Sequence, residues 1–237
     1  MSTEILILEN VSGGYGKLPV VFDVDLKVYE GETIAVIGPN GSGKSTLMKI
    51  VAGVATIHSG RILFKNEEIT SVPAYIRTIK GLGYLPQVDN IFPHLTVQEN
   101  LEMGGYNLSK EMLRDRIRMI FQLFPEIEKK KMQKAGTLSG GERQMVALGR
   151  VLINNPDLII LDEPSANLAP KLVSKIFEKI REIKNMGKTI VLVEQHAKKA
   201  LEYSDRGVVM RSGRIVLTGR GDELVNSTEL RQAFLGT

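Results

Sequence analysis

The sequence predicts an α/β fold built around a mostly parallel β-sheet, and three observations carry this prediction. Compact apolar runs at 33–37, 158–161 and 189–193 are typical of strands buried within a sheet. Apolar residues recur at helical spacing between them, for example over 44–54. Glycine and proline residues separate these strand-like and helix-like segments. Alternating strands and helices are the pattern from which α/β folds are built.

Composition is that of an ordinary globular protein. With 237 residues the chain can bury a substantial core, and 43% of its residues are hydrophobic and 24% charged. No window approaches an uninterrupted apolar run of about 18 residues. The N-terminus carries an acidic residue where a signal peptide needs positive charge, so we expect a cytosolic protein. The lack of cysteine excludes disulfides and thiolate metal sites.

The net charge of +4 is spread along the chain rather than gathered in one block. The densest basic cluster consists of Lys129, Lys130, Lys131 and Lys134. It has two interpretations: contact with nucleic-acid or lipid phosphates, or a solvated helix end. We favour the helix end, because charge runs of this kind usually face water.

A small β element is expected at the front of the chain. Apolar runs at 5–8 and 20–28 predict strands of an N-terminal antiparallel β subdomain, joined by a glycine-rich loop at 13–16. The strand at 33–37 then stops at Gly38, and a helix begins at Lys44.

The middle of the chain is expected to be mostly helical. Short strands at 60–64 and 83–85 lead into helical spacing over 96–124, which Pro125 closes. A further helix is predicted over 139–153.

The remaining segment returns to alternating elements. A helix over 170–186 ends at Gly187, in front of the strand at 189–193. Apolar runs at 208–210 and 214–217 flank Arg211-Ser212-Gly213, which predicts a β-hairpin.

A glycine-rich motif joins the strand at 33–37 to the helix that follows. Residues 38–45 read GPNGSGKS and fit the phosphate-loop pattern G-x-x-x-x-G-K-[ST] in full. Glycines let the loop turn its amides inward, and the helix N-terminus attracts the same anion. Lys44 is predicted to reach the β- and γ-phosphates, and the Ser45 hydroxyl to ligate Mg²⁺. The predicted binding residues are Gly38, Pro39, Asn40, Gly41, Ser42, Gly43, Lys44, Ser45 and Thr46.

The buried strand at 158–161 ends in Asp162 and Glu163. Such a strand delivers an Asp to the carboxyl edge of the sheet, where it can hold Mg²⁺, often through a water. Glu163 is then placed to polarise an attacking water as a general base. Alone, an Asp-Glu pair after an apolar run usually marks only a strand end. The phosphate loop upstream favours the catalytic interpretation, and the two motifs together predict a P-loop NTPase core.

Residues 138–144 read LSGGERQ and form a second glycine-containing helix start. Ser139 is expected to cap the helix, and Glu142 to complete a capping box. Two glycines at a helix N-terminus also make a second anion site, which a single γ-phosphate hardly needs from one subunit. We therefore predict that Ser139, Gly140 and Gly141 complete the nucleotide pocket of a partner in a head-to-tail, two-fold dimer.

The ordered set of motifs resembles the ATPase subunit of an ATP-binding cassette (ABC) transporter. The resemblance implies ATP and Mg²⁺ as cofactors and ATP hydrolysis coupled to transport. We expect one ABC ATPase domain over 1–237, with 1–87 and 136–237 as its β and phosphate-loop core and 88–135 as a helical subdomain. The resemblance covers essentially the whole chain and rests on GGYG (13–16), GPNGSGKST (38–46), LPQ (85–87), LSGGERQ (138–144) and LIILDEP (158–164).

The resemblance also implies further site residues. Tyr15 would stack on the adenine, which suits a lone aromatic residue in a glycine loop. Gln87 would contact Mg²⁺ or the attacking water and link the site to the helical subdomain. A loop over 165–169 would cross the dimer interface, and a histidine beyond the strand at 189–193 would sense the γ-phosphate.

Two positions depart from the usual family pattern. Most members carry an Asp near position 169, where this chain has Ala169 followed by Pro170. At the switch, Glu194 is followed by Gln195 and then His196. The phosphate-sensing role therefore falls to either Gln195 or His196.

These departures are usual among importer ATPases for branched-chain amino acids, which the segments at 96–106, 135–150, 162–170 and 193–207 also resemble. That resemblance implies a homodimer, or a heterodimer with a related ATPase, at the cytoplasmic face of the membrane. Its partners would be integral membrane permease subunits and, indirectly, an extracytoplasmic solute-binding protein. Urea or amide uptake and lipid or lipopolysaccharide export stay open, because the solute never touches this subunit.

A nucleic-acid-associated ATPase with the same head is disfavoured. Such proteins carry a long coiled coil between the two motifs, and this chain has no sustained heptads there. We therefore expect no nucleic-acid partner. Membrane subunits are expected to bury against a groove near 87–106. Ile91, Phe92 and Leu95 are candidates for that contact, and a local core is an equally good explanation for them.

Overall fold

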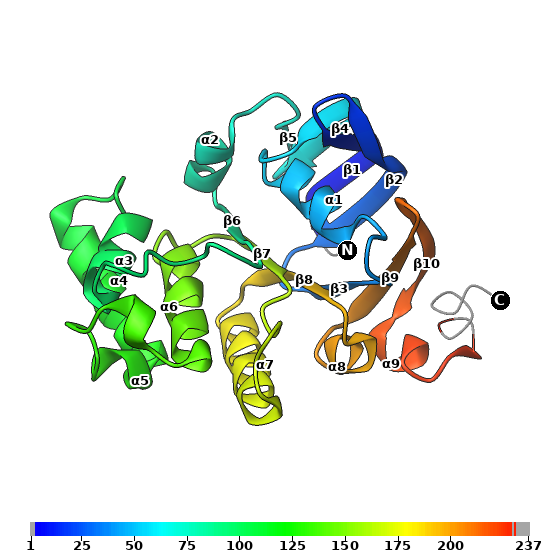
Figure 1. The fold of residues 1–237 in the computed structure, drawn as a ribbon. Coiled ribbons are helices and arrows are strands. Elements are labelled where there is room, and N and C mark those ends of the chain that lie inside the picture. The colour runs from blue at the N-terminus through cyan, green and yellow to red at the C-terminus, as the bar shows by residue number, and fades with distance from the viewer. Residues whose placement is uncertain (1–2, 229, 231–237) are drawn as a thin grey trace.

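The computed structural model describes residues 3–228 and 230, which form two β-sheets with helices around them (Figure 1). In the central sheet, every neighbouring pair except the edge pair β10–β9 is parallel. The predicted α/β class with a mostly parallel sheet is confirmed. In spatial order the six strands are β10 (Arg214–Arg220), β9 (Arg206–Arg211), β3 (Thr33–Ile37), β8 (Thr189–Glu194), β7 (Leu158–Asp162) and β6 (Leu82–Leu85).

Different parts of the chain cover the two faces of the central sheet. Along β3, Ile34 and Val36 face the N-terminal sheet and α1 (Lys44–Val51), whereas Ala35 and Ile37 face the helices of the other side. Successive side chains of a strand point to opposite faces, so a strand covered on both sides needs an unbroken apolar run. The predicted strands at 33–37, 158–161 and 189–193 are buried along their whole lengths.

The N-terminal sheet is antiparallel, as predicted, and consists of β2 (Leu18–Tyr29), β1 (Glu4–Tyr15), β4 (Thr56–Phe64) and β5 (Glu67–Glu68) in that order. The loop expected at 13–16 was wrong in part, because Gly13 to Tyr15 continue β1. Glycine is needed at Gly13, since a β-carbon there would lie 2.3 Å from the Thr56 carbonyl oxygen. These glycines bring β4 close to β1 and shift the strand register instead of ending the strand.

The helical region lies at one side of the molecule, beyond β6 (Figure 1). The helical spacing over 96–124 resolves into two helices, and the second of them ends just before Pro125, as predicted. Pro125 also begins a further short helix, α5, because the first turn of a helix does not require its missing N–H. The helices of this region are α3 (Val97–Gly104), α4 (Lys110–Leu123), α5 (Pro125–Glu128) and the 3₁₀ turn η1 (Ala135–Thr137).

Of the remaining helices, α6 and α7 lie within a few residues of their predicted bounds, whereas α2, α8 and α9 were not predicted. The predicted β-hairpin is formed by β9 and β10. Along residues 3–228 and 230, no helix combines the length and the apolar character needed to cross a lipid bilayer. The helices are α2 (Ala74–Ile79), α6 (Gly140–Leu152), α7 (Pro170–Asn185), α8 (Ala197–Glu202) and α9 (Gly221–Leu224).

Candidate functional site

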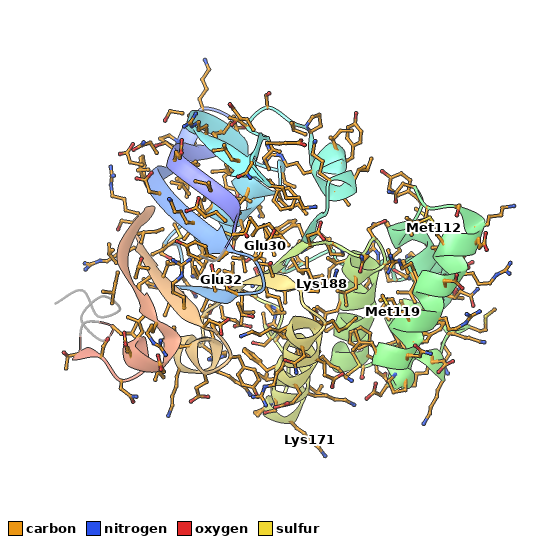
Figure 2. The ribbon with its side chains drawn as sticks, turned by 180° about the vertical axis from the view of Figure 1, so that it is seen from behind. Glu30, Glu32, Met112, Met119, Lys171 and Lys188 are labelled. Carbon is orange, nitrogen blue, oxygen red and sulfur yellow. The ribbon has the colours of Figure 1, made fainter. Side chains whose placement is uncertain are left out.

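The phosphate loop lies at the carboxyl edge of the central sheet, between β3 and α1. Gly41 and Gly43 have φ angles of 76° and 97°, a region that glycine adopts without strain. A β-carbon on Gly38 would lie 2.2 Å from the Met210 carbonyl oxygen on β9. Figure 2, seen from behind, labels Glu32 and Lys188 at the opposite edge, where β3 and β8 begin. The site therefore occupies the edge at which ligands bind in open α/β sheets.

Lys44 begins α1 and is buried, with 4% of its surface exposed. Its Nζ donates to the carbonyl oxygens of Gly38 (2.9 Å) and Pro39 (3.1 Å), so it folds back across the loop. Burial lowers the pKa of Lys44, and the nearby carboxylates of Glu163 and Asp162 oppose that shift. A positive charge is thus held under the loop at the point where a phosphate group would neutralise it.

Asp162 ends β7 and is almost fully buried. Its Oδ1 accepts a hydrogen bond from the Ser45 Oγ (2.8 Å), and its Oδ2 accepts one from the Tyr84 hydroxyl (3.1 Å). Burial raises the pKa of Asp162, and these two hydrogen bonds oppose the rise. A hydroxyl oxygen beside a carboxylate is the oxygen-rich donor set that Mg²⁺ prefers, so these residues fit that ion.

The sequence did not single out Tyr84, which is a third member of this group. It lies on β6, opposite Ile160 of the neighbouring β7. Burial raises the pKa of Tyr84, and the negative charge of Asp162 adds to the rise, so its hydroxyl stays a hydrogen-bond donor. Only the pairing of β6 with β7 brings it to Asp162, and that pairing cannot be derived from the residues around Tyr84.

Glu163 follows β7 in a left-handed conformation, with φ of 48°, which is uncommon for a residue other than glycine. Its Oε2 accepts hydrogen bonds from the Gln87 Nε2 (2.6 Å) and the Gln195 Nε2 (2.7 Å). Strained backbone of this kind persists where the surroundings hold it in place, and it clusters at functional sites. Two amides thus fix one carboxylate oxygen, and the carboxyl group lies beside the phosphate loop.

A cavity of about 260 Å³ lies between the phosphate loop and Glu163. Loop residues 40–46 line it together with Val20, Gln87, Glu163 and Gln195. Within the described part of the chain, the buried hydroxyl of Ser42 has no hydrogen-bond partner. An unpaired buried donor in such a cavity suits an anionic ligand, because phosphate oxygens accept hydrogen bonds.

Gln195 and His196 lie in different surroundings, although they are adjacent in sequence. Gln195 contacts Glu163 in the cavity, as described above. His196, at the start of α8, does not line that cavity but a neighbouring hollow, which Gln195 also lines together with Leu168 and Pro170. The geometry therefore brings Gln195, and not His196, to the group beside the phosphate loop.

Tyr15 lies beside the cavity at the end of β1, with 47% of its surface exposed. Its hydroxyl is 3.5 Å from the Thr46 Oγ1 and 3.4 Å from the Lys49 Nζ. The Lys49 ammonium also lies 5.7 Å from the centre of the Tyr15 ring. The exposed ring is thus held next to the phosphate loop, where a nucleobase has room to stack on it.

Ser139 caps α6 in the capping box that the sequence predicted. The Glu142 amide donates to the Ser139 Oγ at 3.4 Å, and the Glu142 Oε2 accepts from the Ser139 amide at 3.0 Å. Neither Ser139 nor the two glycines after it are among the residues that line the 260 Å³ cavity. One chain therefore does not bring its two glycine-rich motifs to the same pocket.

The loop at 165–169 connects β7 to α7 and lies next to the start of α6. The Ser165 amide donates to the Glu194 Oε1 at 3.2 Å. Burial raises the pKa of Glu194, a residue that sequence analysis gave no structural role. Leu168 of this loop and Leu172 of α7 pack so near Gly140 and Gly141, respectively, that added β-carbons would come within 3.1 Å and 2.9 Å of them. Glycine is therefore the residue that lets this loop approach the start of α6.

A second hollow, of about 300 Å³, lies between β6 and the helical region. Asn90 and Arg150 line it, and the Arg150 guanidinium lies 4.4 Å from the centre of the exposed Phe92 ring. Ile91 and Leu95 are only partly buried. The hollow thus borders the predicted docking segment at 87–106, from which Asp89, Asn90, Met103 and Gly104 line it.

Comparisons with known proteins agree with this geometry. Residues 21–166 match the family model described as "ABC transporter". A probable branched-chain amino acid transport ATP-binding protein, LivF of Archaeoglobus fulgidus, is 44% identical over 95% of this chain and 96% of its own length. The high-affinity branched-chain amino acid transport ATP-binding protein BraG of Pseudomonas aeruginosa is 40% identical over 98% of this chain and its own entire length.

A lipopolysaccharide export system ATP-binding protein, LptB of Haemophilus influenzae, is 34% identical over 98% of this chain and 97% of its own length. Among solved structures, the ADP conformation of an ATP-binding cassette of an ABC transporter matches with a TM-score of 0.88 and 30% identity, and each chain is covered completely. A dimeric post-hydrolysis cassette bound to ADP and phosphate matches with a TM-score of 0.80 and 28% identity over 91% of this chain and 98% of its own.

Proposed function

The chain belongs to the ABC transporter family of ATP-binding proteins, and from that premise we propose that it drives an importer for branched-chain amino acids. ATP hydrolysis coupled to transport is the activity of this family. The observation that supports hydrolysis here is the convergence of Lys44, Asp162 and Glu163 at one edge of the central sheet. The choice of solute rests on likeness to two importer ATPases.

Each residue at this edge has a proposed role. Lys44 binds the β- and γ-phosphates, and Ser45 and Asp162 hold Mg²⁺, which supplies positive charge to the phosphate oxygens when bound. Glu163 takes a proton from the attacking water. Gln87 and Gln195 hold the Glu163 carboxylate in position through their hydrogen bonds.

Two chains are proposed to share each nucleotide. Ser139, Gly140 and Gly141 of one copy, or of a related ATPase, face the phosphates held by the other. Their separation from the 260 Å³ cavity within one chain supports this arrangement. A solved relative is a dimer with ADP and phosphate bound, which agrees with it. Tyr15 stacks on the adenine from its place beside Thr46.

Membrane permease subunits are proposed to dock at the 300 Å³ hollow. Two of the residues that line it, Val54 and Met103, are apolar and exposed in the single chain. Exposed apolar patches of this kind commonly mark interaction sites. Gln87 lies at the near end of this surface and contacts Glu163, so docking and hydrolysis are linked through one side chain.

The solute is tested by purifying the chain with its membrane subunits and solute-binding protein and reconstituting the complex in liposomes. Leucine, isoleucine or valine should raise ATP hydrolysis several-fold, because a loaded binding protein favours the closed ATPase dimer. Urea, short-chain amides and lipopolysaccharide or phospholipid are compared in parallel. Stimulation by urea alone would replace the amino-acid assignment. Stimulation by lipid alone would favour the export role named for the LptB relative.

A further inference from the structure

The start of α6 carries a carboxylate beside the residues proposed to receive a phosphate. Glu142 is the third residue of this helix, and its Oε2 accepts hydrogen bonds from the Ser139 amide (3.0 Å) and hydroxyl (2.9 Å). The Ser139 hydroxyl has a single hydrogen, so an anion that accepts it must take it from Glu142. That anion would lie within two hydrogen-bond lengths, about 6 Å, of the Glu142 carboxylate.

The Glu142 carboxylate has two opposing effects at the start of α6, one on helix stability and one on anion binding. An acidic side chain in the first turn stabilises a helix through its dipole. The same negative charge weakens the positive potential that draws a phosphate to the helix N-terminus. A helix start that must both be capped by Glu142 and bind an anion needs a nearby cation.

Lys130 supplies that cation, from the turn after α5. Its Nζ lies 2.8 Å from the Glu142 Oε1, the carboxylate oxygen that does not contact Ser139. Burial alone would raise the pKa of Glu142, but the hydrogen bonds from Lys130 and Ser139 lower it overall, so the carboxylate stays ionised. The pair is therefore a true ion pair whose two charges largely cancel.

The neighbouring lysines do not share this position. Lys129, Lys131 and Lys134 are exposed, and none of them forms an ion pair with any residue that the structure describes. Lys130 is partly buried, as its contact with Glu142 requires. The solvated helix end expected from the sequence fits three of the four lysines. The fourth, Lys130, forms an ion pair with Glu142 on α6.

We propose that Lys130 neutralises Glu142 so that the start of α6 can receive the γ-phosphate of a nucleotide bound by the other chain of the dimer. Lys130 is then a positioning residue that acts through Glu142 and does not touch the nucleotide. The inference rests on the proposed function, in which Ser139, Gly140 and Gly141 complete the partner's site.

A double-mutant cycle on the full chain tests the proposal through steady-state ATP hydrolysis. Lys130→Met should raise KM for ATP by about 3- to 10-fold, since it leaves an unpaired but partly solvated carboxylate near the phosphate. The same substitution should change KM by less than about twofold in a Glu142→Gln background, because no charge remains to be neutralised. Lys131→Met is the matched control and should leave KM unchanged.

Thermal unfolding of each variant separates this role from a merely structural ion pair. If Lys130→Met raised KM equally in both backgrounds, or left KM unchanged in the wild-type background, the proposal would be overturned. Ser139→Arg tests the proposed function separately from the role of Lys130. If that variant hydrolysed ATP normally, the proposed role of Ser139, Gly140 and Gly141 would itself fail. If it lost activity while Lys130→Met kept the wild-type KM, only the role of Lys130 would fail.

Discussion

The proposed site has two sides that differ in burial. One side consists of the phosphate loop with Asp162 and Glu163, and the other is the start of α6 with Ser139, Gly140 and Gly141. Lys44, Asp162 and Glu163 are 4%, 1% and 7% exposed, and each is hydrogen-bonded within the chain. Ser139 is exposed at the start of α6, outside the cavity that Lys44 and Glu163 line. The first region is organised in the single chain, whereas the second is exposed, as the proposed shared site requires.

This difference follows from what each region has to do. Fixed charges stabilise a transition state best when they are held in place and shielded from water. A helix start that completes another chain's pocket must instead remain accessible until the two chains meet. Control of hydrolysis by assembly is the expected consequence of the proposed shared site, in which one chain carries the reacting groups and its partner completes the pocket.

The largest effect is expected from Glu163→Gln, which should abolish proton transfer from the attacking water and leave dimer formation intact. The amide cannot accept the proton of water, so ATP turnover should fall by about 10³-fold. ATP binding should persist, because Lys44 and Ser45 are unchanged. Phosphate release measures turnover, and gel filtration with ATP should reveal an accumulated dimer. Glu68→Gln, on exposed β5, is the control and should behave as wild type. Wild-type turnover of Glu163→Gln would remove the general-base role.

A smaller effect is expected from a mixture that tests whether the two sides come from different chains. Lys44→Ala and Ser139→Arg should each lower turnover by at least about 10²-fold on their own. Mixed in equal amounts, they should recover up to about a quarter of wild-type activity, because half of the dimers then contain one intact site of two. The readout is ATP turnover against mixing ratio. A mixture no more active than its components would contradict a shared site.

The sequence predicted those parts of the site that depend on neighbours along the chain. Residues 38–46 carry their own loop geometry, and the capping box of α6 needs only Ser139 and Glu142. The buried strand before Asp162 was evident from its apolar run. These features are local, so the residue types and their spacing are enough to derive them.

The missed features depend on contacts between distant segments. Tyr84 reaches Asp162 only through the pairing of β6 with β7. Lys130 reaches Glu142 only through the packing of the turn after α5 against α6. Similarly, the glycines at 13–14 looked like a loop because their close approach to β4 is invisible in the sequence. Register and packing, rather than residue type, decide all three.

The smallest effect is expected from two variants that compare Gln195 with His196. They test which of these residues acts at the phosphate-loop side of the site. Gln195→Ala removes one of the two amides that hold the Glu163 carboxylate, so turnover should fall by about tenfold with little change in KM. His196→Ala should change turnover by less than about twofold, because the imidazole does not line the cavity that Glu163 and Gln195 share. The two variants are matched, since they truncate adjacent residues at the end of the same strand.

The ratio of the two turnover losses decides which residue acts at the switch. A larger loss in His196→Ala would mean that closure of the dimer turns the histidine toward the phosphate. The organised side would then be rebuilt on assembly rather than preformed. A larger loss in Gln195→Ala would instead mean that the amide contact of the single chain persists in the closed dimer. In that case the usual histidine is replaced by an amide that acts through Glu163, and the preformed half of the site needs no rearrangement there.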